Sequence, residues 1–304
     1  MVYGSASLPD DDFQYAATLV ENKLNEAFSL MGITRIQFND YRPRYTPTVA
    51  SLFIGFLLND YVEVEDVGIK VPDIWLEMGW RERESFLRAY WNNASNDKQN
   101  ELVNFYHNFF EISDLDEGNK LPAKIGVCLD SSMNEVMYGQ GTLLGMNIPP
   151  KSIANRSDAE QVVLHELIHT IQHNIGTPVD VGTQVNDLWL IEGQATYLSG
   201  QKMASNAPGY YPVNVVDSWD AGQEFGDEGL AYKHYAKAYS YIDAHSGKGR
   251  VLQLLHDVRN YQSKGSNFGH AGISSDRFTE AFNTNMVKAN GEQLTLEEFR
   301  NNYQ

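Results

Sequence analysis

The segment Val163-Leu-His165-Glu166-Leu-Ile-His169 constrains the fold more than any other part of the chain. Apolar residues at three-and-four spacing around it predict a helix from about Ala159 to Asn174. Histidines four residues apart lie one turn above each other on the same helix face, so both imidazoles can reach one metal ion. Glu166 lies at the edge of that face, where it can take a proton from a metal-bound water. This HExxH pattern predicts a metal-dependent hydrolase; the alternative is a pair of core histidines beside an exposed glutamate.

A catalytic zinc site needs a third protein ligand and one open position for water. The metzincin pattern is excluded, because it would need Gly and His where the chain has Gln172 and Ile175. Asp180 and Asp187 are candidates for an aspartate-ligated site. Glu192, 23 residues after the second histidine, is the stronger candidate. His173 extends the histidine row by another turn, and we expect it to face solvent or support the site rather than bind metal.

Two linked motifs resemble a known family. Asp187-Leu-Trp-Leu-x-Glu192-Gly-x-Ala-x-Tyr197, downstream of His165-Glu166-x-x-His169, resembles the gluzincin metallopeptidases, and most closely the aminopeptidase N branch and its peptidase MA-like relatives. The resemblance covers the chain from about Lys124 onward. It implies an α+β, zincin-like catalytic domain with a small sheet and active-site helices. It also implies one catalytic Zn²⁺ held by His165, His169 and Glu192, with Glu166 as general base.

A third stretch fits the same family. Tyr235-Ala-Lys-Ala238 resembles the Tyr-x-Lys-Gly segment of aminopeptidases, which implies that Tyr235 donates a hydrogen bond to the developing oxyanion. Tyr232, one turn earlier, is the alternative donor, because the sequence does not fix the helix register. A histidine could take the same part, and the further candidates are His234, His245, His256 and His270.

The chain departs from the aminopeptidases at the strand before the zinc helix. Their Gly-Ala-Met-Glu-Asn motif binds the substrate's free amino group through its glutamate, whereas the segment Gly141-Thr-Leu-Leu-Gly-Met-Asn147 has no acidic residue. We therefore expect an endopeptidase that holds an extended peptide along this strand. Two other functions remain open: a zinc-binding module with a non-catalytic interaction role, and a metal hydrolase of non-peptide amides or epoxides.

The helix and strand patterns of the sequence divide the chain into two regions. Residues 1–118 form a mainly helical N-terminal region whose role the sequence does not predict, and residues 119–304 form the gluzincin-like peptidase domain. Two strands joined by a polar turn at 131–134 are expected at the start of the second region. The strands are predicted at Lys124–Asp130 and Val136–Ile148. The helices are predicted at Phe13–Leu30, Pro47–Leu58, Ile74–Trp91, Lys98–Phe110, Ala159–Asn174, Asp187–Ser199, Leu230–His245, Gly249–Asn260 and Asp276–Phe282. The end of the chain, Phe278–Phe282 and then Leu294–Phe299, resembles the helical tail of the gluzincin catalytic domains.

The composition limits the partners. A formal charge of −17 argues against nucleic acid and anionic membranes, because both would be repelled. The longest apolar run, Val49–Leu58, is too short to cross a bilayer, and no signal peptide is visible. The single cysteine, Cys128, excludes an internal disulfide and a cysteine-based zinc cluster. The expected partner is a peptide or protein substrate; the sequence predicts neither the oligomeric state nor the compartment, whether cytoplasmic or exported.

Overall fold

A computed structural model of the chain describes most of the elements expected from the sequence. The described residues are 2–4, 8–41, 67–109, 125–129, 139–141, 145–178, 185–201, 228–261, 274–301 and 303. The predicted helix Pro47–Leu58, the turn at 131–134 and the boundary at residue 118 lie outside them.

The described part of the chain is mostly helical and contains one small sheet, which is an α+β arrangement in the general sense. The sheet has four strands in the order β1-β2-β4-β3. The strands β1 (Val2–Gly4), β2 (Gly126–Leu129) and β4 (Gly145–Ile148) run parallel, whereas β3 (Gln140–Gly141) pairs antiparallel with β4 at the edge. Every residue of β2 and β4 is buried, as expected for parallel strands covered by helices.

The strand prediction was wrong in one respect. The stretch predicted as one strand, Val136–Ile148, contains two strands, because β3 pairs antiparallel with β4, with Gly141 opposite Met146. β2 and β4 pair in parallel, with Val127 opposite Met146. Parallel strands cannot be joined by a tight turn, so the pairing is set by the packing of distant segments.

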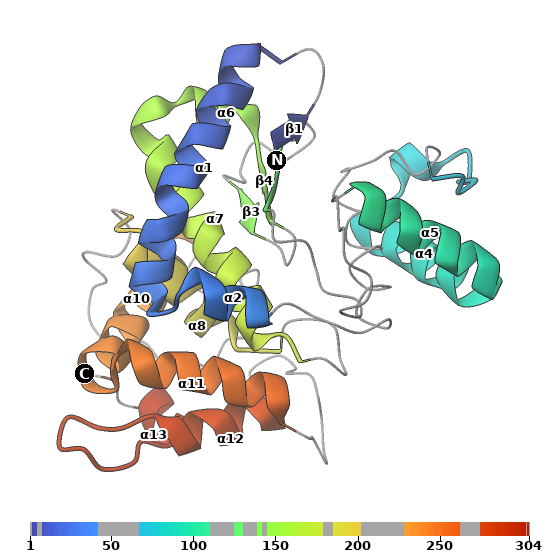
Figure 1. Cartoon of the computed structure of the whole chain (residues 1–304). Helices are drawn as coiled ribbons and strands as arrows, with labels where there is room; N and C mark the ends of the chain where they lie inside the picture. The colour runs from blue at the N-terminus through green and yellow to red at the C-terminus, as the bar shows by residue number, and fades with distance from the viewer. Residues whose placement is uncertain are drawn as a thin grey trace.

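The helix α7 (Arg156–Gly176) lies at the centre of the molecule (Figure 1). All its residues from Val162 to Gln172 are buried, because α1, α8, α11 and the strands β3 and β4 pack around it. A helix that is buried on all sides is typical of the interior of a domain. The helix begins at Arg156 after an N-cap at Asn155, three residues before the start at Ala159 expected from the sequence.

The N-terminal helix α1 (Asp10–Met31) packs along α7 (Figure 1). Three aspartates in its first turn complement the positive end of the helix dipole. Gly32, at φ 75°, ends it in a left-handed conformation that lets the amides of Gly32 and Ile33 reach the last carbonyls. Buried residues of α1 belong to the same hydrophobic core as those of α7. Part of the N-terminal region therefore packs directly against the helix that carries both histidines.

The other predicted helices within the described residues are present, with small shifts of their ends. The predicted helix Ile74–Trp91 is interrupted, because Gly79 caps a new helix and its amide donates to the Glu82 carboxylate at 2.8 Å. The remaining helices are α2 (Arg35–Tyr41), η1 (Trp75–Glu77), α4 (Trp80–Asn93), α5 (Asn96–Phe109), α6 (Pro150–Ala154), α8 (Leu188–Leu198), α10 (Glu228–His245), α11 (Gly247–Asn260), α12 (Asp276–Asn285) and α13 (Leu296–Asn301).

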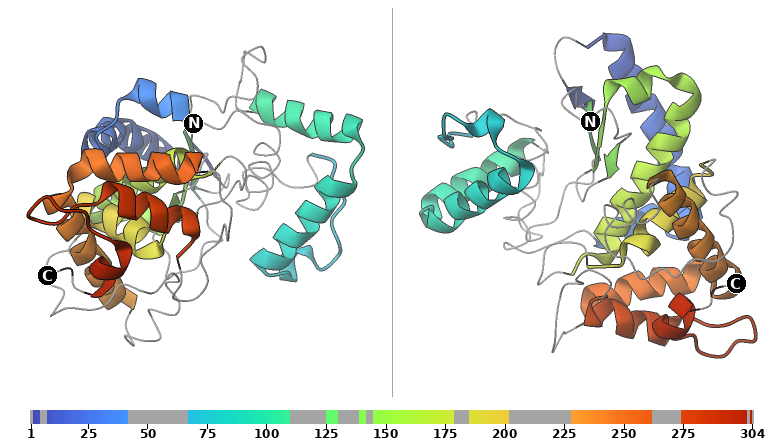
Figure 2. Two further views of the ribbon diagram at one scale, coloured as in Figure 1. Left: turned by 90° about the horizontal axis from the view of Figure 1, so that it is seen from below. Right: turned by 180° about the vertical axis from the view of Figure 1, so that it is seen from behind.

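The helices α4 and α5 lie to one side of the other elements in all three views (Figures 1 and 2). Their buried residues, Leu87 and Leu102, are not part of the core shared by α1 and α7. Val67, Ile69 and Trp75 are likewise buried outside that core. None of the described helices is both long and apolar enough to cross a bilayer.

Candidate metal centre

The two histidines of α7 point to one side of the helix with their Nε2 atoms together. His165 and His169 are one turn apart, and their Nε2 atoms lie 2.9 Å from each other. The ring planes are at 81°, so the two imidazoles meet edge to face. Both side chains are buried, with 8 % and 9 % of their surface exposed. The helical spacing therefore produces the shared face that the sequence predicts.

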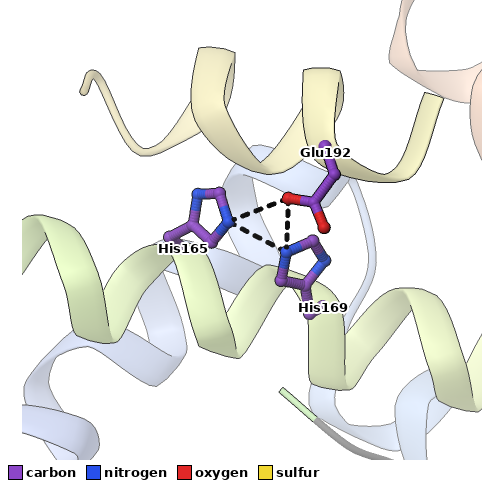
Figure 3. A group of neighbouring side chains, drawn as sticks. All are labelled: His165, His169 and Glu192. Atoms are coloured by element: carbon purple, nitrogen blue, oxygen red, sulfur yellow. Dashed lines mark hydrogen bonds and ion pairs between the residues drawn. The ribbon is translucent and has the colours of Figure 1, made fainter. Parts of the chain in front are cut away.

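The second helix, α8, places Glu192 against this pair. One carboxylate oxygen of Glu192, Oε2, lies 3.4 Å from His165 Nε2 and 3.2 Å from His169 Nε2 (Figure 3). The ligand atoms of the three residues all lie within 4.8 Å of one another, so this buried group could hold a metal ion. The packing of α7 against α8 holds these three side chains together.

The spacing of the three donor atoms fits a metal with short bonds. Nitrogen and oxygen ligands at 2.0–2.2 Å from a tetrahedral ion lie about 3.3 Å from each other. The three donor-to-donor distances here are 2.9, 3.2 and 3.4 Å. The buried Glu192 Oε2 also accepts no well-formed hydrogen bond from the described residues. A cation between the three atoms would satisfy it.

The charges of the group depend on one another. Burial alone would raise the pKa of Glu192, but the adjacent His169 and His165 lower it well below its usual range. Burial alone would lower the pKa of His169, yet the Glu192 carboxylate raises it to about 9. Without a metal, the group is therefore a buried ion pair between Glu192 and a protonated His169. A divalent cation would take the place of that proton.

Glu166 lies beside the group on α7 and is buried under β3. A Cβ added to Gly139 would lie 2.6 Å from Glu166 Cγ and 2.7 Å from Glu166 Oε1, so the edge of the sheet covers this carboxyl group closely. Burial raises the pKa of Glu166, while the two histidines oppose that shift. The position next to the histidines is the one expected of a general base; the role itself stays a prediction.

Tyr235 lies on α10, which packs closely against α8. A Cβ added to Gly193, the residue after Glu192, would meet the backbone of Tyr235, so the two helices touch at this glycine. The Tyr235 side chain is buried, and its ring lies 6.2 Å from that of Tyr232, which is half-buried. The helix thus passes next to Glu192, whereas the hydrogen bond from Tyr235 to an oxyanion remains a prediction.

The other candidates lie elsewhere. Asp187 stands at the N-cap of α8, where its carboxylate contacts Trp189, Ser274 and Arg300, so it is a structural residue and not a third ligand. His173 is outside the metal-binding group, and burial lowers its pKa to about 4. His234, His245 and His256 are not in the group either, while Asp180 and His270 lie outside the described residues.

One residue of the site was not recognised from the sequence. Gln172 appeared there only as a departure from the metzincin pattern, yet its Oε1 lies 2.8 Å from His169 Nδ1. Its position three residues after His169, on the same helix face, was the available signal. In comparisons with known proteins, the chain matches no family model, no curated protein and no solved structure.

Proposed function

We propose that this protein is a zinc-dependent peptidase of the gluzincin type that acts as an endopeptidase. The observation that carries the proposal is the convergence of His165, His169 and Glu192, from two packed helices, with Glu166 beside them. The order of the motifs along the chain supports the same assignment. A peptidase needs both a metal-binding group and a nearby base, and these four side chains would supply them.

Zinc is the ion that the donor set favours. Two imidazole nitrogens and one carboxylate oxygen form the His₂Glu set found in thermolysin and carboxypeptidase A. Softer ions would favour thiolates, and the only cysteine, Cys128, is buried in β2. When bound, the ion acts as a Lewis acid that polarises the scissile carbonyl, and it lowers the pKa of a bound water to about 7.

Glu166 would move the protons of the reaction. It would take the proton of the attacking water and return it to the leaving amine. Its burial favours this task, because a raised pKa brings a carboxyl group closer to neutral pH. Tyr235 would donate a hydrogen bond to the oxyanion, with Tyr232 as the alternative. Such a donor contributes about 3 kcal/mol at the transition state.

The edge strand supports a peptide as the substrate. β3 is an edge strand of the described sheet and packs against α7, where a Cβ added to Gly141 would meet His169. An extended peptide could add to this edge through backbone hydrogen bonds, which orient a chain without requiring a particular sequence. This arrangement is the basis on which we propose a zincin-like fold for the sheet and α7.

Cleavage of an unfolded protein, with and without a chelator, tests the proposal. We expect wild-type protein to carry one zinc per chain and to cleave the substrate, and Glu166→Gln to keep the zinc but lose about 10²–10⁴-fold in rate. Glu160→Gln is the matched control, because Glu160 is an exposed residue of α7 that pairs with Lys23. Full activity in the zinc-loaded Glu166→Gln variant, or cleavage that a chelator does not affect, would contradict the mechanism.

A further inference from the structure

We propose that Gln172 is a positioning residue of the metal site: its side-chain amide sets the tautomer of His169 and holds the helix that carries Glu192. The inference rests on the metal site of the proposed function but does not depend on peptidase activity. Gln172 is fully buried on α7, with no exposed surface. A buried amide must satisfy its hydrogen bonds within the protein, so its partners define its orientation.

Both the oxygen and the nitrogen of the Gln172 side-chain amide form hydrogen bonds. Its Oε1 lies 2.8 Å from His169 Nδ1. Its Nε2 donates to the backbone carbonyl of Ile191 at 3.0 Å and to Gln194 Oε1 at 2.8 Å. Three hydrogen bonds of ordinary length therefore converge on one side chain that has no contact with solvent.

The partner at Ile191 decides which way the amide faces. A backbone carbonyl oxygen only accepts hydrogen bonds, so the nitrogen of Gln172 must face it. The oxygen of Gln172 then faces His169 Nδ1, and that atom must carry a hydrogen. In the neutral ring, the lone pair is consequently on Nε2, the atom 3.2 Å from Glu192 Oε2. The amide thus prepares His169 to bind a metal through Nε2.

The same amide connects the two helices of the site. Ile191 and Gln194 stand on either side of Glu192 in α8, so Gln172 holds α8 at the turn where the carboxylate ligand emerges. Gln194 extends the chain of hydrogen bonds, because its Nε2 donates to the Tyr239 hydroxyl of α10 at 2.9 Å. His165 has no such support, since its buried Nδ1 finds no hydrogen-bond partner among the described residues.

The tautomer can be measured in the wild-type protein without metal. At a pH where the spectrum shows a single proton on the His169 ring, two-bond ¹H–¹⁵N correlations should place that proton on Nδ1. A proton on Nε2 would overturn the inference. This measurement needs neither a variant nor bound zinc. If the wild type binds no zinc, the proposed function fails, while the spectrum still tests the role assigned to Gln172.

Variants of Gln172 test its effect on zinc affinity. Gln172→Met keeps the length of the side chain and removes all three hydrogen bonds, so we expect zinc to bind about 10–100-fold more weakly. The control is Gln161→Met, since Gln161 is a half-buried residue of α7 that donates to the Gly200 carbonyl, just beyond α8, at 2.9 Å. It removes a bond between α7 and the segment that follows α8 without touching a histidine, and should change zinc affinity by less than twofold.

A third variant separates the two effects of the amide. The carboxylate of Gln172→Glu still accepts a hydrogen bond from His169, but it cannot donate to Ile191 or Gln194. We expect it to keep the proton on Nδ1, whereas Gln172→Met should show both tautomers. Zinc affinity is measured by competition with a chromophoric chelator. If folded Gln172→Met binds zinc within twofold of the wild type and keeps a single tautomer, the inference is wrong.

Discussion

Gly139, just before the edge strand β3, and Gly141, within β3, allow this edge of the sheet to approach Glu166. A Cβ on Gly139 would lie within 2.6–2.8 Å of Glu166 Cγ, Oε1 and Cδ. A Cβ on Gly141 would meet the backbone of α7 at Glu166 and the Cβ of His169. The first contact is with the flexible end of a side chain, and the second is with backbone. The two positions therefore differ in what a methyl group would disturb.

We predict that Gly139→Ala selectively impairs the base. The methyl group should push the Glu166 carboxylate aside while His165, His169 and Glu192 stay in place. A displacement of about 1 Å costs roughly 10²-fold in rate, so the activity should fall by about that factor with zinc still at one per chain. Turnover and metal content of the same sample measure the two effects.

The control for this prediction is Gly249→Ala. Gly249 lies in α11, and an added Cβ there meets nothing within 4 Å. This change should leave the rate unaltered and stabilise the protein by up to about 1 kcal/mol, because alanine favours the helix. Loss of zinc in Gly139→Ala would mean that β3 supports the ligands rather than the base.

At the level of elements, a buried ion pair joins the start of α8 to the last helix. Arg300 of α13 donates to the Asp187 carboxylate at 2.9 Å, and only 1 % of the Asp187 side chain is exposed. Trp189 Nε1 and the Ser274 hydroxyl donate to the same carboxylate. The position of α8, and with it of Glu192, therefore depends on the C-terminal end of the described chain.

We predict that Arg300→Met destabilises the fold by about 3 kcal/mol, because it leaves the buried charge of Asp187 without its cation. Urea unfolding measures the free energy of unfolding of the metal-free protein. Lys288→Met is the control, since it removes the exposed Lys288–Glu298 pair, 2.8 Å long, and should cost at most about 1 kcal/mol. Equal losses of unfolding free energy in the two variants would show that the Asp187–Arg300 pair contributes no more than an exposed ion pair.

The elements that the sequence predicts well are those defined by local pattern. The helices α7 and α8 follow from apolar spacing, and the shared face of His165 and His169 follows from the helical period, whereas the assignment of Glu192 rests on the resemblance of its motif to the gluzincins. The strand pairing does not follow, because β1, β2 and β4 are distant in sequence and their contacts are set by packing. Gln172 could not be assigned for the same reason, since its partners Ile191 and Gln194 lie on another helix.

For the whole molecule, the metal site links stability to pH. His169 has its pKa raised from 6.5 to about 9 in the metal-free fold. A raised pKa stabilises the fold fully below pH 6.5, and this contribution is lost as the pH rises through 9. The shift corresponds to about 3 kcal/mol, mostly from the Glu192 carboxylate. Zinc requires the neutral ring, so its binding should strengthen over the same pH range.

We therefore predict that the melting temperature in chelator and the gain on adding zinc change in opposite directions with pH. Between pH 6.5 and 8.5 the melting temperature should fall in a chelator, and the gain on adding zinc should grow, because less work is needed to remove the proton from His169. Thermal unfolding at several pH values, with chelator or with zinc, measures both slopes. Glu192→Gln removes the main cause of the raised pKa, so the slope in chelator should be lost in that variant. A zinc-induced gain that stays constant over this range would show that His169 holds no proton for the metal to displace.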